Sequence, residues 1–166
     1  MLRVVALDES HDLEPFESGN GELDTWLRTH ARNATGQGTR TYVVMDDRDA
    51  VVGYFAIAPH VLDRGDAPKR LGRGAPRQIP AILLAKLALS EHLHGRGLGA
   101  ELLLHALNTI LDAARTAGGK LVVVDAIDDD ATAFYGHHDF EPLPDRPDRL
   151  VMKLSTVARA LGVEWP

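Results

Sequence analysis

The chain has 166 residues, a net charge of −6 and 45% hydrophobic residues, which is typical of one globular domain. It has no cysteine, and this excludes disulfides, thiolate catalysis and cysteine-based zinc sites. No apolar run approaches the roughly 20 residues that span a membrane, and the N-terminus lacks the apolar region of a signal peptide. We therefore expect a single domain over residues 1–166, in the cytoplasm and without membrane contact.

Local patterns divide the chain into alternating strands and helices. In the first half they predict a strand at 2–7, a helix with Asn20 as N-cap, a break at 33–38, strands at 41–45 and 51–57 around a turn at 46–49, and a loop with a short helical turn at 59–80. In the second half they predict a strand at 81–89, helices at 98–117 and 130–137, strands at 121–126 and 150–154, and a C-terminal helix capped by Ser155. This order indicates a mixed α/β fold whose N-terminal half is antiparallel.

Three glycines lie where the predicted strand at 81–89 connects to the start of the predicted helix at 98–117, in the run His94 to Ala100. Glycines at this place leave backbone N–H groups uncovered at a helix N-terminus. Such a terminus binds anions, most often phosphate groups. The loop therefore predicts a phosphate-bearing ligand.

Two known phosphate loops differ from this one. A P-loop needs Lys followed by Ser or Thr after the glycines, and neither follows here. Gly95, Gly97 and Ala100 do match a dinucleotide-binding fingerprint, with Asp125 as the ribose-binding acid. However, residues 90–94 separate the strand from the first glycine, and too few residues follow Asp125 for further βαβ units. A glycine-rich connection without a ligand is the remaining alternative.

The loop closely resembles the pyrophosphate loop of the GNAT superfamily of N-acetyltransferases, whose signature is Q/R-x-x-G-x-G/A. Here the signature reads His94-Gly95-Arg96-Gly97-Leu98-Gly99, with His94 where the family has Gln or Arg. A second segment, Ala131-Thr132-Ala133-Phe134-Tyr135 followed by Phe140, is similar to the family element A-x-x-F-Y-x-x-x-G-F. Asp139 stands where that element has glycine.

Three further segments resemble one subgroup, the toxins of toxin–antitoxin pairs that acetylate aminoacyl-tRNA. Residues 16–27 look like the N-terminal helix of these toxins, 52–56 like their third strand, and 79–88 like the run into their acetyl-CoA strand. The segments occur in the same order and at the same spacing.

This resemblance implies a mainly antiparallel central sheet, flanked by helices and splayed at a central parallel strand pair, in one N-acetyltransferase domain over residues 1–166. It implies acetyl-CoA as co-substrate and no metal. Its pyrophosphate would lie on the loop amides, and its pantetheine arm would pair with a strand edge. The residues expected to bind acetyl-CoA are Leu87, Ala88, Leu89, His94, Gly95, Arg96, Gly97, Leu98, Gly99, Ala100 and Phe134.

Tyr135 is the candidate catalytic residue, because it matches the family position of the general acid. A thiol has a pKa of about 8.5 and a tyrosine of about 10, so a nearby tyrosine can donate a hydrogen bond or proton to a leaving thiolate. A backbone N–H near Leu89 is the expected oxyanion donor. No strong general base is evident. This favours an α-amino group, with a pKa of about 8, as the substrate.

Basic residues gather in two segments of an otherwise acidic chain. They indicate either a solvated, mixed surface or a basic groove for a polyanion. With the resemblance to tRNA-acetylating toxins, the predicted tRNA contacts are Arg28, Arg32, Arg40, Lys69, Arg70, Arg73 and Arg77.

The expected function is acetyl transfer from acetyl-CoA to the α-amino group of aminoacyl-tRNA, which blocks translation. The resemblance also implies a ribbon-helix-helix antitoxin as partner and a homodimer. Two alternatives remain: an N-acetyltransferase of a small amine or protein N-terminus, which suits the acidic charge, and a catalytically inactive acyl-CoA-binding regulator. The histidine pairs 92/94 and 137/138 lack a carboxylate at ligand spacing. Residues 128–130 are expected to cap a helix N-terminus.

Overall fold

The computed structural model describes residues 2–166, which form a mixed α/β structure. The strands are β1 (Arg3–Ala6), β2 (Arg40–Met45), β3 (Val51–Asp63), β4 (Gln78–Leu89), β5 (Leu121–Asp125), β6 (Glu141–Leu143) and β7 (Arg146–Lys153). The helices are α1 (Gly21–Thr29), α2 (Ala31–Thr35), α3 (Lys69–Gly72), α4 (Leu98–Ala117), α5 (Asp129–His137) and α6 (Leu154–Leu161), with short 3₁₀ turns η1 (Arg64–Asp66) and η2 (Glu91–Leu93). No helix within residues 2–166 is long and apolar enough to cross a membrane.

The strands form one seven-stranded sheet in the order β1-β2-β3-β4-β5-β7-β6. The pairs β1–β2, β2–β3, β5–β7 and β6–β7 are antiparallel, and β4 and β5 are parallel. The ladder between β4 and β5 ends at Leu84 and Val124, although β4 continues to Leu89. The mainly antiparallel sheet with a central parallel pair confirms the fold class predicted from the sequence.

The chain divides into two compact units, one made of the residues up to Ala58 with 85–107 and the other of 59–84 with 108–166. In the first unit, β1, β2 and β3 form an antiparallel meander. The Asp46 side chain accepts the N–H groups of Arg48 and Ala50, both at 2.9 Å, and so closes the turn between β2 and β3. The predicted hairpin is confirmed.

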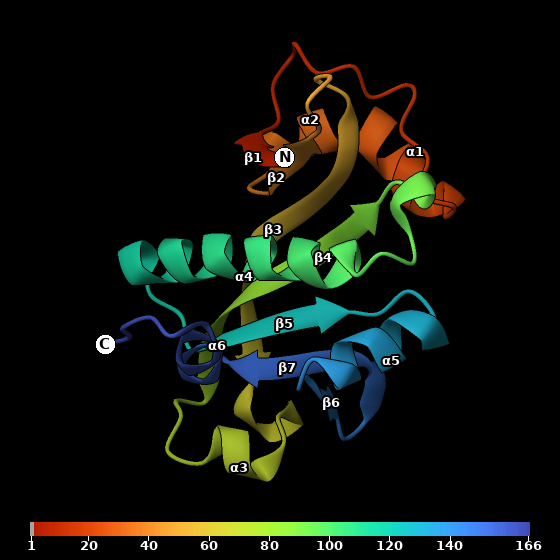
Figure 1. Ribbon diagram of the computed structural model, residues 1–166. Coiled ribbons are helices and arrows are strands. Elements are labelled where there is room, and N and C mark those ends of the chain that lie inside the picture. The colour runs from red at the N-terminus through yellow and green to blue at the C-terminus, as the bar shows by residue number, and fades with distance from the viewer. Residues whose placement is uncertain (1) are drawn as a thin grey trace. The chain divides into compact units, whose positions relative to one another are not determined.

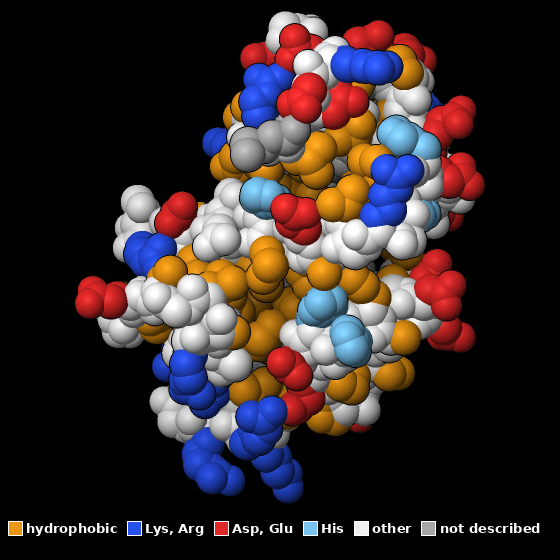
Figure 2. Space-filling view, viewed as in Figure 1, with side chains coloured by type: hydrophobic (Ala, Val, Ile, Leu, Met, Phe, Trp, Pro, Cys, Tyr) orange, Lys and Arg blue, Asp and Glu red, His pale blue; other side chains and the backbone are white. Residues whose placement is uncertain are grey.

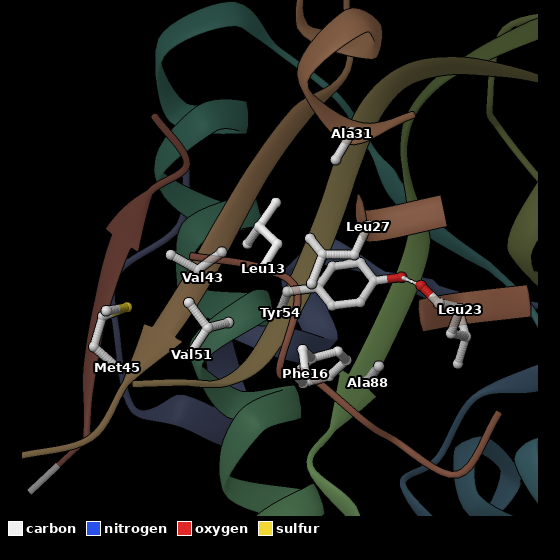
Figure 3. Packing of buried hydrophobic residues seen from close by; sticks show 10 residues of the cluster. All are labelled: Leu13, Phe16, Leu23, Leu27, Ala31, Val43, Met45, Val51, Tyr54 and Ala88. Atoms are coloured by element: carbon white, nitrogen blue, oxygen red, sulfur yellow. Dashed lines mark hydrogen bonds between the residues drawn. The ribbon is translucent and has the colours of Figure 1, made fainter. Parts of the chain in front are cut away.

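The core of the first unit packs around Tyr54 on β3 (Figure 3). Asn20 caps α1 by accepting the N–H of Leu23 at 3.0 Å, as predicted. The Tyr54 hydroxyl donates to the carbonyl of Leu23 at 2.7 Å and so ties α1 to the sheet. Leu27 is fully buried in this core. The half-buried ring of Trp26 stacks on Tyr54 with a centroid separation of 6.0 Å.

In the second unit, β5 lies between β4 and β7, and Figure 1 shows β5 and β7 running side by side in opposite directions. The β5–β7 register places Leu121 opposite Lys153 and Asp125 opposite Arg149. Ile79 on β4 is fully buried beside residues of β5 and β7. The sequences of these strands are almost continuously apolar, because both faces of this part of the sheet are covered.

The segment predicted as a loop at 59–80 is shorter than expected. Strand β3 continues to Asp63 and β4 begins at Gln78, so Pro59 and Pro80 both lie within strands. Proline lacks a donor, but a strand accepts it at a position where no ladder hydrogen bond needs its nitrogen. The predicted helical turn is present as η1 and α3.

Two helix boundaries and two strands also differ from the prediction. Strand β7 begins at Arg146, four residues before the predicted strand at 150–154. Helix α1 ends at Thr29 and α2 follows, so the break falls at His30 and not at 33–38. Helix α6 begins at Leu154 with no side-chain cap, and Ser155 lies inside it. Strand β6 was not predicted, because three residues are too few to show an alternating pattern.

A buried hydroxyl on β2 allows a test of this packing. Thr41 is 4% exposed, and its Oγ1 has no hydrogen-bond partner within residues 2–166. Valine has the same shape without the polar group, so Thr41→Val should raise the free energy of unfolding by about 1 kcal/mol. Urea denaturation measures this change.

The matched control is Thr29→Val, because the exposed Thr29 hydroxyl already donates to the Thr25 carbonyl at 2.7 Å. We expect no gain in stability from that variant. A Thr41→Val protein that is less stable than the parent would contradict the burial of an unpaired hydroxyl.

Candidate functional site

The glycine loop joins β4 to α4 within the first unit. Gly95 and Gly97 have φ angles of 80° and 75°, in the left-handed region that glycine adopts without strain, and a Cβ at either position would lie in open space. Helix α4 begins at Leu98, as predicted. Its first four N–H groups have no partner within the helix, and Gly97 has no side chain to cap them. This geometry is the one that the predicted anion site requires, and anion binding by the loop stays a prediction.

His94 braces this loop against the end of β4. Its Nε2 lies 2.8 Å from the carbonyl oxygen of Leu89. A carbonyl only accepts, so Nε2 carries the proton and donates. This contact gives the histidine a conformational role in the position where the related signature has Gln or Arg.

Two backbone N–H groups that follow Leu89 are already used in hydrogen bonds and are therefore excluded as oxyanion donors. The N–H of Ser90 donates to the carbonyl of Val52 at 2.8 Å, and the N–H of Glu91 donates to the carbonyl of Glu17 at 2.8 Å. Neither group is free for a ligand. Successive N–H groups in a strand point to opposite edges, so the N–H of Leu89 points away from the edge that Ser90 uses.

In the second unit, α5 positions Tyr135. The Asp128 carboxylate accepts the N–H of Ala131 at 2.8 Å and caps this helix, which confirms the predicted N-terminal cap. The ring of Tyr135 is buried and contacts Phe134 and Phe140 edge-on, with centroids 5.4 and 5.5 Å away. These two ring contacts limit the rotation of the Tyr135 side chain, so the position of α5 determines where its hydroxyl points.

The turn after α5 keeps the conformation that a glycine would give. Asp139 has a φ angle of 71°, and aspartate is among the residues that tolerate the left-handed region. The carbonyl of Tyr135 accepts the N–H groups of His138 and Phe140 at 3.0 and 3.1 Å. Aspartate in place of glycine therefore does not prevent this turn.

A polar network not predicted from the sequence lies across β5 and β7. The Arg149 guanidinium donates from Nε to Oδ1 of Asp125 at 2.6 Å and from Nη2 to Oδ2 at 2.8 Å. Its Nη1 lies 3.1 Å from Nε2 of His60. Arginine can only donate, so Nε2 of His60 accepts and its Nδ1 carries the proton. This imidazole is therefore neutral, and its Nε2 is not free to act as a base.

The charges of this network shift three pKa values. The hydrogen bond from Arg149 lowers the pKa of Asp125, and the same bond raises the pKa of Arg149. Burial lowers the pKa of His60, and the charge of Arg149 lowers it further. The Asp125–Arg149 pair is bidentate and half-buried, which makes it stronger than an ion pair in open solvent.

The same environment keeps Tyr135 protonated. Burial raises its pKa above the ordinary value of 10.0, and the negative charge of Asp125 raises it further. The hydroxyl is therefore a hydrogen-bond donor throughout the neutral range. Sequence reasoning missed His60 and Arg149, because only the strand register places Arg149 opposite Asp125.

The predicted basic residues of the first unit are bonded to the protein itself. Arg28 donates to the carbonyl of Phe16 at 2.9 Å, and Arg32 donates to the carbonyl of His11 at 2.7 Å. Arg40 donates to the carbonyl of Thr35 at 3.0 Å. Each guanidinium therefore holds a backbone segment, whatever else it contacts.

The predicted basic residues of the second unit lie on and after α3 and are exposed. They are Lys69, Arg70, Arg73 and Arg77. Figure 2 shows Lys and Arg side chains gathered over this part of the chain. Arg70 forms an ion pair with Glu141, and the other three side chains form none with any residue of 2–166. This group is the better candidate for a polyanion surface.

No cluster of three or more His, Cys, Asp or Glu side chains that could hold a metal ion occurs in the part of the chain that the structure describes. His137 and His138 pack against each other edge-on, with ring centroids 5.2 Å apart.

Replacing Asp125 by Asn tests the network. The folded-state pKa of Asp125 lies below 3.8, so its carboxylate stabilises the fold above about pH 4, and this stabilisation is lost as the pH falls through the folded pKa. Asp125→Asn should therefore be less stable than the parent at pH 7, and the difference should shrink below pH 4. Thermal unfolding across this range measures it.

The control is Asp112→Asn, which removes an exposed carboxylate that pairs with Arg115 at 2.9 Å. Exposed pairs contribute little, so this variant should follow the parent at every pH. An Asp125→Asn protein with the stability of the parent at pH 7 would show that the bidentate pair makes no net contribution.

Known proteins share this architecture and sequence. No protein-family model matches the chain. The tRNA-acetylating toxin of Mycobacterium tuberculosis (strain ATCC 25618 / H37Rv) is 38% identical over 157 residues, which cover 94% of each chain. A structure of AtaT complexed with acetyl-methionyl-tRNAfMet has a TM-score of 0.87 at 27% identity, and the match covers 97% of this chain and 99% of that one.

A second solved structure is a mutant of AtaT bound to the C-terminus of the antitoxin AtaR and to acetyl-CoA. It has a TM-score of 0.83 at 26% identity, and the match covers 98% of this chain and 99% of that one. The glycine loop that opens α4 and the Tyr135 element on α5 lie within this shared length. The chain belongs to the GNAT-fold family of tRNA-acetylating toxins.

Proposed function

We propose that this protein is an acetyl-CoA-dependent N-acetyltransferase toxin that acetylates the α-amino group of aminoacyl-tRNA and thereby blocks translation. The observation that carries this proposal is the 38% identity to a tRNA-acetylating toxin over 94% of both chains. The glycine loop and the environment of Tyr135 support the chemistry, each within its own unit.

The glycine loop fits the pyrophosphate of acetyl-CoA. Gly95 and Gly97 adopt positive φ angles with open space where a side chain would project, so the backbone can approach a ligand closely. The uncovered amides at the start of α4 and the helix dipole attract a diphosphate. Arg96 is exposed and adds positive charge. We propose that the end of β4, at Leu87, Ala88 and Leu89, holds the pantetheine arm. Phe134 is a further proposed acetyl-CoA contact.

Tyr135 is proposed to stabilise the leaving group. Acetyl-CoA supplies a thioester whose carbonyl an amine can attack. The Tyr135 hydroxyl keeps its proton, because burial and the charge of Asp125 raise its pKa. Since a thiol ionises at about pH 8.5, full proton transfer from this tyrosine is unfavourable, and the hydroxyl acts mainly as a hydrogen-bond donor to the developing thiolate. The N–H of Leu89 is the proposed oxyanion donor.

An α-amino substrate needs no strong general base, and His60 supplies none. His60 is neutral, but its Nε2 accepts from Arg149. An α-amino group has a pKa of about 8 and is partly neutral at cytoplasmic pH without help, whereas a lysine side chain is not. Aminoacyl-tRNA provides such an amine together with a polyanion that the exposed cations on and after α3 can attract.

We expect Tyr135→Phe to lower kcat for acetylation of aminoacyl-tRNA by about 10²-fold, because loss of one preorganised hydrogen-bond donor to a developing negative charge costs about 10²–10³-fold in kcat. The KM for acetyl-CoA should stay within a few-fold of the parent, since the hydroxyl acts on the leaving group. Labelled acetyl transfer to charged tRNA, with uncharged tRNA as blank, measures both. The matched control is Tyr42→Phe, whose ring stacks on Phe55 at 5.2 Å in the other unit.

Two outcomes would favour the alternatives. Label that appears on small amines or protein N-termini and not on charged tRNA would assign the acidic chain to another class of N-acetyltransferase. Acetyl-CoA binding without turnover on any amine would make it an acyl-CoA-binding regulator. Unchanged kcat in Tyr135→Phe would remove this residue from the mechanism and leave the substrate assignment intact.

Charge reversal tests the proposed tRNA surface. The pair Lys69→Glu and Arg77→Glu should raise the KM for charged tRNA at least about tenfold and reduce the salt dependence of that KM, because contacts with phosphates release counterions. Arg146→Glu with Arg159→Glu makes the same change in net charge at other exposed positions of the second unit and should have little effect. If both charge-reversed pairs raise the KM for charged tRNA equally, the net charge of the protein and not the proposed surface determines tRNA binding.

The proposal also includes an antitoxin that binds the toxin and inhibits it. The structure of AtaT with the C-terminus of AtaR describes an antitoxin bound to a toxin of this fold. We propose a ribbon-helix-helix antitoxin for this chain, a homodimeric toxin and action in the cytoplasm, with residues 1–166 as one acetyltransferase domain. Arg28, Arg32 and Arg40 remain proposed tRNA contacts beside their structural hydrogen bonds.

A further inference from the structure

The hydrogen bond of His94 lies on the open edge of β4. The ladder between β4 and β5 ends at Leu84, although β4 continues to Leu89. The N–H of Ser90 donates to the carbonyl of Val52 on β3 at 2.8 Å, so this group uses the edge that faces β3. The carbonyl of Leu89 belongs to the same peptide unit and points the opposite way, to the open edge, where it accepts from Nε2 of His94 at 2.8 Å.

The turn η2 brings the imidazole back to the strand. Leu93 and His94 donate their N–H groups to the carbonyls of Ser90 and Glu91 at 3.0 and 3.1 Å. The N–H of Glu91 donates to the carbonyl of Glu17 at 2.8 Å and ties the turn to the segment before α1. Backbone contacts therefore place the histidine without help from a ligand.

The carbonyl that His94 covers lies beside the proposed oxyanion donor. In an extended strand the N–H and the C=O of one residue point to the same edge, so both groups of Leu89 face the open edge. An oxyanion that accepts from this N–H comes close to the negative end of the neighbouring carbonyl dipole and is repelled by it. The proton on Nε2 of His94 is bonded to that carbonyl and offsets its charge.

The same contact fixes the peptide unit between Leu89 and Ser90 at both ends. His94 holds its carbonyl oxygen, and the Val52 carbonyl holds its N–H. A peptide unit is planar, so two hydrogen bonds in opposite directions limit its rotation. Leu89 is also buried, with 8% of its surface exposed. Its own N–H therefore has a defined direction before a ligand binds, which is what a preorganised oxyanion site requires.

We propose that His94 is a positioning residue for acetyl transfer. Its Nε2–H fixes the peptide unit after Leu89 and covers the Leu89 carbonyl, so that the adjacent N–H of Leu89 can bind the thioester oxygen. The inference rests on the proposed function, because it assigns a role within the same site.

Two substitutions separate the donor from the bulk of the side chain. Glutamine keeps a terminal N–H donor, whereas leucine has none. His94→Leu should lower kcat for acetyl transfer about tenfold, less than the cost of losing an oxyanion donor, because the Leu89 N–H remains. His94→Gln should restore kcat to within about threefold of the parent, since the lost donor is replaced. The KM for acetyl-CoA should change less than kcat in His94→Leu.

Two further measurements need no acceptor amine. Infrared difference spectroscopy of bound, isotope-labelled acetyl-CoA should show the thioester carbonyl stretch at lower frequency than in water. His94→Leu should reduce this shift, and His94→Gln should keep it. In the free protein, the amide hydrogen of Ser90 should exchange faster in His94→Leu than in the parent, because its peptide unit loses one of two hydrogen bonds.

His92→Leu is the matched control, because His92 is an exposed histidine of the same turn. It should match the parent in every measurement, and circular dichroism checks that each variant folds. A carbonyl shift that His94→Leu leaves unchanged, or a defect confined to the KM for acetyl-CoA, would overturn the inference. A parent protein that shows the shift but transfers no acetyl group to charged tRNA would contradict the proposed function and still support the role of His94.

Discussion

The parallel pairing of β4 with β5 is the constraint on which the glycine loop depends. Parallel strands cannot be joined by a tight turn, so the chain must cross from the end of β4 to the start of β5 through a long connection. Helix α4 makes that crossing, and its N-terminus follows the end of β4. A helix that starts there needs a sharp change of direction, which Gly95 and Gly97 provide at positive φ. The uncovered amides of the anion site are a consequence of this connection.

In the second unit, burial and the charges around Tyr135 and Asp125 determine the protonation of both side chains. The role proposed for Tyr135 requires a protonated hydroxyl, and burial and the Asp125 carboxylate both favour the protonated form by raising its pKa. A half-buried carboxylate needs a partner of its own, and Arg149 supplies two parallel hydrogen bonds. That guanidinium in turn engages Nε2 of His60. Burial therefore keeps Tyr135 protonated with the help of the Asp125 charge, and the Arg149 that pairs with this carboxylate also occupies Nε2 of His60.

The accuracy of the sequence-based prediction depended on how local each signal was. The bounds of α4 were predicted correctly, because glycines precede Leu98 and follow Ala117 and the apolar spacing between them is regular. The caps Asn20 and Asp128 were also found, since a cap is a contact over three residues. The extent of β3 and β4 was missed, because Pro59 and Pro80 suggest a loop when the neighbouring strands are unknown.

The residues of the candidate site also fall into those that local sequence predicts and those that only contacts between distant residues bring together. The sequence by itself determined the glycine loop with its positive φ angles and the position of Tyr135 in the chain, because positive φ and helix capping are properties of a few consecutive residues. Only the tertiary structure decided that Arg149 binds Asp125 and that His94 donates to the carbonyl of Leu89. These contacts depend on strand register and on chain reversals between distant residues. A change of one residue in register would turn Arg149 to the opposite face of the sheet and remove its contact with Asp125.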